Sequence, residues 1–168
     1  MKDLKDKVIW ITGASSGIGE ATAYKMAKEG AKLVLSARRK EELERVKNAC
    51  GLLENDILVL PLDVENFESF ESLKNIVVAK FGRIDILFNN AGTSQRGGVL
   101  ESDLSVFQKI ININLIGVVA LTKAVLPQMI KQNAGHIVVT SSLSGKLGSP
   151  MRSGYCASKH ALHGFFEA

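Results

Sequence analysis

The chain has 168 residues, of which 46% are hydrophobic and 23% charged, and its net charge is +4. This length and composition suit one globular domain over residues 1–168 and exclude a disordered or fibrous chain. Lysines and arginines alternate with acidic residues, as in "RRKEELERVK", so the small positive charge does not favour nucleic-acid binding.

The sequence shows neither a signal peptide nor a membrane segment. The first residues, "MKDLKDKV", are charged, and the longest apolar run, "LIGVVAL", is far shorter than the ~20 residues of a membrane span. The two cysteines, Cys50 and Cys156, lie far apart in the sequence, and free thiols in a reducing compartment are the simplest interpretation of this pattern. We therefore expect a soluble, cytoplasmic protein.

Five short runs rich in valine, isoleucine and leucine alternate with helix-length segments. The runs predict strands at 7–12, 32–36, 57–61, 83–89 and 136–141. The segments between them predict helices at 17–29, 39–50, 66–81 and 103–131, with a last helix beginning near 154. Continuous apolar strands are typical of a parallel sheet that is buried on both faces. The alternation predicts a doubly wound α/β fold.

The segment 103–131 is apolar nearly all round, and such a helix is normally covered on more than one side. A second copy of the chain, in a homo-oligomer through this helix and the C-terminal helix, is one possible cover. Deep burial within a monomer is the other.

A glycine-rich loop, "TGASSGIG" (12–19), follows the first strand and opens the first helix. Its glycines suit a tight turn and close approach of the backbone to a phosphate group, and the new helix offers free N–H groups to a diphosphate. The loop predicts nucleotide binding by Thr12, Gly13, Ser15, Ser16, Gly17, Ile18 and Gly19.

The end of the second strand bears on the choice between NAD and NADP(H), the dinucleotides that such a loop commonly binds. NAD-selective sites usually carry an acidic residue there, whereas this chain has Ser36, Ala37, Arg38 and Arg39. A guanidinium pairs with the 2′-phosphate of NADP(H) through two charge-assisted hydrogen bonds. We expect NADP(H) in preference to NAD, with Arg38 and Arg39 as the candidate contacts.

Tyr155 and Lys159 are four residues apart and share one face of the last predicted helix. At ~5 Å and an effective dielectric of ~20, the lysine ammonium favours the phenolate form of the tyrosine by roughly 3 kcal/mol. The pair predicts proton transfer near neutral pH. Cys156, His160 and His163 lie on a different face of the same helix; we expect packing or subunit contacts there rather than a zinc site.

The order of these motifs resembles the short-chain dehydrogenase/reductase family. The glycine loop is followed by "NNAG" (89–92), "NINLIG" (112–117), "TSSLSG" (140–145) and "YCASK" (155–159). The resemblance implies a Rossmann-type sheet with strand order 3-2-1-4-5 and four catalytic residues, Asn114, Ser142, Tyr155 and Lys159. It also implies cofactor contacts at Asp63, Val64, Asn90, Ala91 and Gly92, and at Tyr155 and Lys159. Arg38 matches the family's NADP-type position, so the resemblance favours it over Arg39.

The family resemblance assigns a role to each catalytic residue. Tyr155 protonates the carbonyl oxygen, Lys159 also holds the nicotinamide ribose, Ser142 hydrogen-bonds the reacting oxygen, and Asn114 positions a relay water. The implied activity is that of an NADP-dependent carbonyl reductase or alcohol dehydrogenase, for which steroid, retinoid and xenobiotic ketones are candidate substrates. No metal is expected, because the cofactor supplies the hydride chemistry.

The resemblance also has implications for the C-terminal end of the chain and for the location of the protein in the cell. The family's sheet continues through two more strands and a substrate-shaping segment, so we expect a fragment or short form whose fifth strand is an exposed apolar edge. An inactive nucleotide-binding fragment and an interaction protein are the alternatives to an enzyme. Association with the endoplasmic reticulum membrane is the alternative to a cytoplasmic location.

Overall fold

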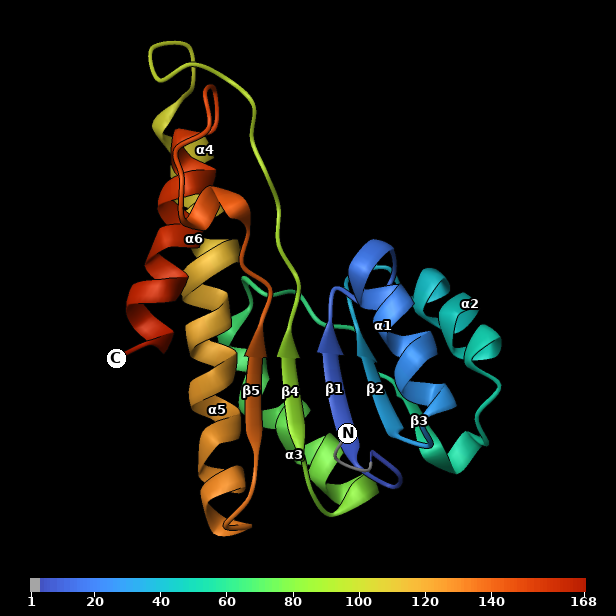
Figure 1. The fold of residues 1–168 in the computed structure, drawn as a ribbon. Coiled ribbons are helices and arrows are strands. Elements are labelled where there is room, and N and C mark those ends of the chain that lie inside the picture. Colours follow the sequence, from blue (N-terminus) through green and yellow to red (C-terminus); the bar gives the residue numbers. More distant parts are fainter. Residues whose placement is uncertain (1–3) are drawn as a thin grey trace.

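A five-stranded parallel sheet runs through the protein in the computed structural model, which describes residues 4–168 (Figure 1). Its order is β3-β2-β1-β4-β5, so the predicted doubly wound fold and strand order are confirmed. The strands are β1 (Val8–Thr12), β2 (Lys32–Ser36), β3 (Ile57–Val59), β4 (Ile86–Asn89) and β5 (His136–Val139). The helices are α1 (Gly17–Lys28), α2 (Lys40–Cys50), α3 (Phe70–Phe81), α4 (Leu104–Ile111), α5 (Gly117–Lys131) and α6 (Ser153–Phe166).

The alternation of side chains along β1 divides the core into two layers. Val8 and Trp10 point to the face covered by α3 and α5, where they pack against Phe70, Val77 and Val125, among other residues. Ile9 and Ile11 point to the opposite face, which α1 and α2 cover with Ala23, Ala27, Leu43 and Val46. Both faces of the central strand are therefore buried, which explains its continuous apolar sequence.

The two connections that leave the centre of the sheet cross to opposite faces. The chain leaving β1 enters α1 on one face, and the chain leaving β4 leads to α4 and α5 on the other (Figure 1). In doubly wound sheets, ligands bind in the crevice that such a reversal opens at the carboxyl ends of the strands. The glycine-rich loop and the segment after β4 both line this crevice.

The segment predicted as one helix over 103–131 has an interruption. A π-helical turn, Asn112–Ile116, separates α4 from α5. The stretch Leu104–Lys131 is long and apolar enough to cross a membrane by length and composition alone, and 44% of its most apolar window is buried inside the fold. Core helices pass the same test. The prediction of a homo-oligomer through this segment remains a prediction.

Strand β5 forms one edge of the sheet, as we expected. Ile137 is half-buried, while the side chain of Val138 is 44% exposed. Helix α6 contacts α4 and the turn that follows β5, and it lies beside α4 in Figure 1.

Candidate active site

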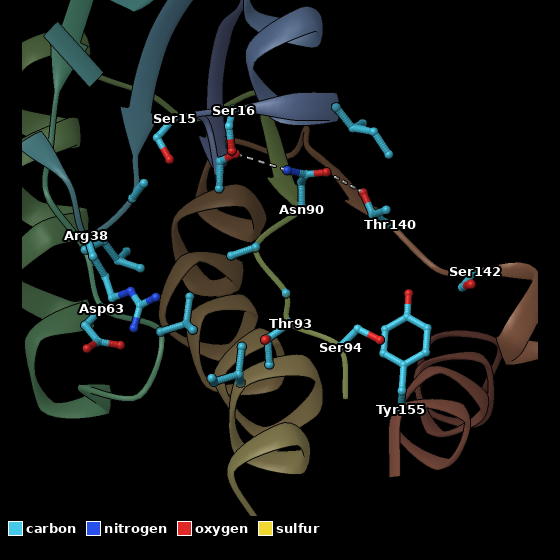
Figure 2. A pocket seen from close by; sticks show the side chains of 18 of the residues that line it. Ser15, Ser16, Arg38, Asp63, Asn90, Thr93, Ser94, Thr140, Ser142 and Tyr155 are labelled. Atoms are coloured by element: carbon cyan, nitrogen blue, oxygen red, sulfur yellow. Dashed lines mark hydrogen bonds between the residues drawn. The ribbon is translucent and has the colours of Figure 1, made fainter. Parts of the chain in front are cut away.

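A cleft of about 960 Å³ opens at the carboxyl ends of the strands, and most of the predicted site residues line it (Figure 2). Figure 2 shows Tyr155 and Ser142 at one end of the cleft, and Arg38 and Asp63 at the other. The predicted residues in its wall are Gly13, Ser15, Ser16, Ile18, Arg38, Arg39, Asp63, Val64, Asn90, Ala91, Gly92, Ser142, Tyr155 and Lys159. Thr12, Gly17, Gly19 and Asn114 lie outside the wall.

The glycine-rich loop is pressed against the segment that follows β4. Gly13 has a φ of +66°, and a Cβ there would lie 2.9 Å from the Cα of Ala91. A Cβ on Gly19 would lie 2.3 Å from the carbonyl oxygen of Gly13. The Thr12 Oγ1 accepts hydrogen bonds from the backbone N–H groups of Asn90 and Ala91, each at 3.0 Å. These contacts explain why side chains larger than hydrogen do not fit at Gly13 and Gly19.

The first turn of α1 suits an anionic group. Within residues 4–168, the Ser16 side chain makes no capping hydrogen bond, so it leaves the N–H groups of this turn without a side-chain partner. Ser15, Ser16 and Ile18 all line the cleft at this point. Free N–H groups and the positive end of the helix dipole are what a diphosphate requires, so the loop fits a dinucleotide.

The end of β2 differs in one respect from the sequence-based interpretation. Ser36 is fully buried; its hydroxyl accepts a hydrogen bond from Trp10 Nε1 at 2.9 Å and donates one to the carbonyl of Leu60 at 2.7 Å. It therefore does not face the cleft, and Ala37 takes the place where an acidic residue would meet a ribose. Arg38 and Arg39 are exposed in the cleft wall, and neither forms an ion pair within the described residues.

Helix α6 carries Tyr155 and Lys159 into the cleft on one face. The Lys159 Nζ lies 5.8 Å from the centre of the Tyr155 ring and donates a hydrogen bond to the carbonyl of Thr140 at 2.7 Å. Lys159 is 5% exposed, and this burial lowers the pKa of its amine. Thr140 is its one hydrogen-bond acceptor among residues 4–168, so two further N–H donors remain for a ligand.

Ser142 begins the turn after β5 with its hydroxyl already oriented. Its Oγ accepts a hydrogen bond from the backbone N–H of Ser144 at 3.1 Å. Because this bond uses a lone pair, the hydroxyl proton stays available to donate into the cleft. Figure 2 shows the Tyr155 hydroxyl directed toward the side of the cleft where Ser142 lies.

Asn114 supports the cleft wall from behind. It is fully buried in the π-helical turn; its Oδ1 accepts from the N–H of Thr93 at 2.8 Å, and its Nδ2 donates to the carbonyl of Thr93 at 2.9 Å. The same Nδ2 donates to Ser158 Oγ at 3.0 Å. π-helical turns are often found at functional sites, and this one ties the cleft-lining loop to the helix of Tyr155.

A chain of hydrogen bonds crosses the floor of the cleft from the glycine-rich loop to Lys159. Asn90 Nδ2 donates to the carbonyls of Thr12 and Gly13, and Thr140 Oγ1 donates to Asn90 Oδ1 at 3.0 Å (Figure 2). The carbonyl of Thr140 then holds Lys159. The cofactor loop and the proposed proton-transfer group are thus linked through the ends of β1, β4 and β5.

The remaining cysteine and histidines of α6 have separate partners. The Cys156 Sγ accepts from the N–H of Ser149, and the His160 Nδ1 contacts the carbonyl of Cys156 at 2.9 Å. His163 lies between Ser141 and Glu167, with Nε2 2.9 Å from the Ser141 Oγ and Nδ1 2.7 Å from a Glu167 oxygen. A Cβ on Gly145 would lie 2.7 Å from that Oγ, so the hydroxyl is enclosed by the turn. Cys156 and His163 therefore connect α6 to the segment that carries Ser142, whereas the contact of His160 is within its own helix.

Several cleft residues escaped the sequence analysis. Most lie within two residues of a predicted site residue in the sequence: Ala37, Leu62, Thr93, Ser94, Ile113, Thr140 and Ser141. Lys109 of α4 is the exception, because it lies five residues before Asn114. No motif in the sequence includes Lys109, so no sequence signal pointed to it.

Residues 7–168 match the family model for short chain dehydrogenases. The chain belongs to the short-chain dehydrogenase/reductase family. Dehydrogenase/reductase SDR family member 7 of Mus musculus is 55% identical over 170 residues, which cover 99% of this chain and 50% of that protein. Its counterpart in Homo sapiens is 54% identical over 169 residues, again over 50% of its length. The chain therefore spans about half the length of the curated relatives it matches.

Solved structures of short-chain dehydrogenases share the fold. A Burkholderia phymatum member of the family, in complex with NAD, superposes with a TM-score of 0.94 at 35% identity, covering 99% of this chain and 60% of that one. A Streptomyces avermitilis member gives a TM-score of 0.91 at 34% identity with the same coverage. Both comparisons span the whole cleft and support its assignment to an oxidoreductase.

Proposed function

We propose that this chain carries the cofactor-binding and proton-transfer residues of an NADP(H)-dependent oxidoreductase that interconverts a carbonyl and a secondary alcohol. The observation that carries the proposal is the single cleft in which Tyr155, Lys159 and Ser142 lie at one end and Arg38 at the other. The bound nicotinamide would supply or accept the hydride.

The chain's own residues would handle the proton and the developing charge. Ser142, whose proton is free, would donate a hydrogen bond to the reacting oxygen, where negative charge develops. Tyr155 would give its phenolic proton to that oxygen in reduction and take it back in oxidation. Lys159, with two free donors and a fixed position on Thr140, would favour the tyrosinate that remains and bind the ribose hydroxyls.

Arg38 supports NADP(H) as the cofactor. It is exposed in the cleft wall with no ion pair among the described residues, and no acidic side chain stands at Ala37 to repel a 2′-phosphate. The Burkholderia phymatum relative was solved with NAD, so the choice between the two cofactors has to be measured on this chain.

The test is a fluorescence titration with NADPH and NADH. Losing one charge-assisted pair costs about 1.5–3 kcal/mol, so Arg38→Ala should weaken NADPH binding at least tenfold and leave NADH binding unchanged. Arg96→Ala is the matched control, because Arg96 is exposed but does not line the cleft. Equal losses for NADPH and NADH would refute the cofactor assignment.

A further inference from the structure

An ion pair between α2 and α1 reaches the glycine-rich loop. The Arg45 guanidinium donates to both carboxylate oxygens of Glu20, at 2.8 and 3.0 Å, and to the carbonyl of Ser15 at 3.3 Å. Its Nε donates to Glu42 at 2.9 Å, and the Tyr24 hydroxyl donates to Glu20 at 2.6 Å. The hydrogen bonds from Arg45, and then from Tyr24, lower the pKa of Glu20 to about 2, so its carboxylate is charged at neutral pH.

The charge on Glu20 is badly placed for a second anion. Glu20 lies in the first turn of α1, and Ser16 and Ile18 at the start of this helix line the cleft, although Glu20 itself does not. A carboxylate is favourable there while the helix end is empty, because it interacts with the positive end of the helix dipole. A diphosphate at the same helix end would meet this negative charge as repulsion.

Arg45 removes this conflict. Its two parallel hydrogen bonds to Glu20 form the bidentate geometry that neutralises a carboxylate most completely. Its third contact, to the carbonyl of Ser15, places the guanidinium directly behind a loop residue that lines the cleft. We propose that Arg45 is a positioning residue for the cofactor, which cancels the charge of Glu20 and holds Ser15, so that the diphosphate binds the first turn of α1 without an unpaired carboxylate beside it.

This inference rests on the proposed dinucleotide binding, and it predicts a pattern different from that of Arg38. The 2′-phosphate distinguishes NADPH from NADH, whereas the diphosphate is common to both. Loss of Arg38 should therefore affect one cofactor, and loss of Arg45 should affect both to the same extent.

The experiment titrates four forms of the 168-residue chain with NADPH and with NADH: the parent, Arg45→Met, Glu20→Gln and the double variant. Arg45→Met should weaken both cofactors about threefold to tenfold, and about 0.5 M NaCl should shrink this loss. The double variant should recover most of this loss and bind both cofactors more tightly than Arg45→Met, because the Glu20 carboxylate is then neutral, although the contacts of Arg45 with Glu42 and Ser15 stay lost. Lys47→Met is the matched control: Lys47 is on the same helix and pairs with Glu54, but it makes no hydrogen bond or ion pair with the loop among the described residues.

Three outcomes would overturn the inference. One is an Arg45→Met variant that loses affinity for NADPH alone, and another is a double variant as weak as Arg45→Met. If Arg45→Met does not fold, Glu20→Gln decides, since weaker binding than the parent would contradict charge compensation. A parent chain without saturable binding of either nucleotide would instead refute the proposed function, and this inference with it.

Discussion

The Asn114 side chain makes three hydrogen bonds, to the N–H and the carbonyl of Thr93 and to Ser158, and its removal should be measurable as lost stability. In Asn114→Ala, the N–H and the carbonyl of Thr93 lose their partners, while Ser158 keeps its bond to the carbonyl of Tyr155. Each polar group left unpaired costs about 1–3 kcal/mol, which gives about 2–6 kcal/mol for the two groups. Thr93 is half-buried beside the cleft, where water can reach it, so we expect the lower part of that range, about 2–3 kcal/mol.

The assay is urea unfolding followed by circular dichroism, with the free energy of unfolding obtained by linear extrapolation. Asn89→Ala is the matched control, because Asn89 is also a buried asparagine but makes one side-chain hydrogen bond, to Thr122 at 3.1 Å. The control should lose about 1 kcal/mol. Equal losses in the two variants, or a loss below about 1 kcal/mol for Asn114→Ala, would refute the view that Asn114 holds the loop at Thr93.

Three further predictions concern the chemistry, the packing and the acid stability of the protein. In a protein of the relatives' full length, Tyr155→Phe should keep NADPH affinity and lower kcat for carbonyl reduction by at least a hundredfold. Lys159→Ala should impair both; near-normal turnover in Tyr155→Phe would show that the proton donor is another group. Gly19→Ala, whose Cβ would meet the carbonyl of Gly13, should lower stability by about 1–3 kcal/mol in thermal melts. Gly148→Ala, at an open position, should not, and equal melting temperatures would contradict the packing argument. The folded pKa of Glu20, about 2, is below its ordinary 4.5, so its ion pair stabilises the fold above pH 4.5 and is lost as pH falls toward 2. The difference in urea midpoint between the parent and Arg45→Met should decrease as the pH falls from 4.5 to 2. A difference that does not change with pH would refute the coupling between Glu20 protonation and stability.

Local patterns in the sequence were sufficient for the doubly wound α/β fold and for part of the cleft, whereas the strand order and the remaining cleft residues came from the family resemblance. Continuous apolar runs identify buried strands, and the glycine loop and the Tyr155/Lys159 spacing identify residues that lie on one loop or one helix face. The position of Ser36 was harder to predict. Strand alternation places its side chain on the face of Val34 and Trp10, and the hydrogen bond that Trp10 donates to it depends on strand register.

Side-chain contacts between separate helices, strands and turns could likewise not be predicted from the sequence. Arg45 meets Glu20 across two helices, and His163 meets Ser141 across the turn after β5. Neither pair has a fixed sequence spacing, because the loops between the elements set the distance. The same holds for the exposed faces of α4 and α5, where an apolar sequence alone did not indicate which sides the rest of the chain would cover.

The π-helical turn at Asn112–Ile116 determines how the side chains of α5 are oriented around the helix axis. A π turn accommodates one residue more than an α turn, so it shifts the later side chains by about 100° around the helix axis. Gly117 then lies against the carbonyl of Val64, where a Cβ would be only 2.3 Å from that oxygen, and Leu121 and Val125 point into the core. Deleting one residue from the turn would restore a regular helix but rotate α5 out of this alignment. The extra residue thus lets one continuous segment present Asn114 to the cleft and an apolar face to the sheet.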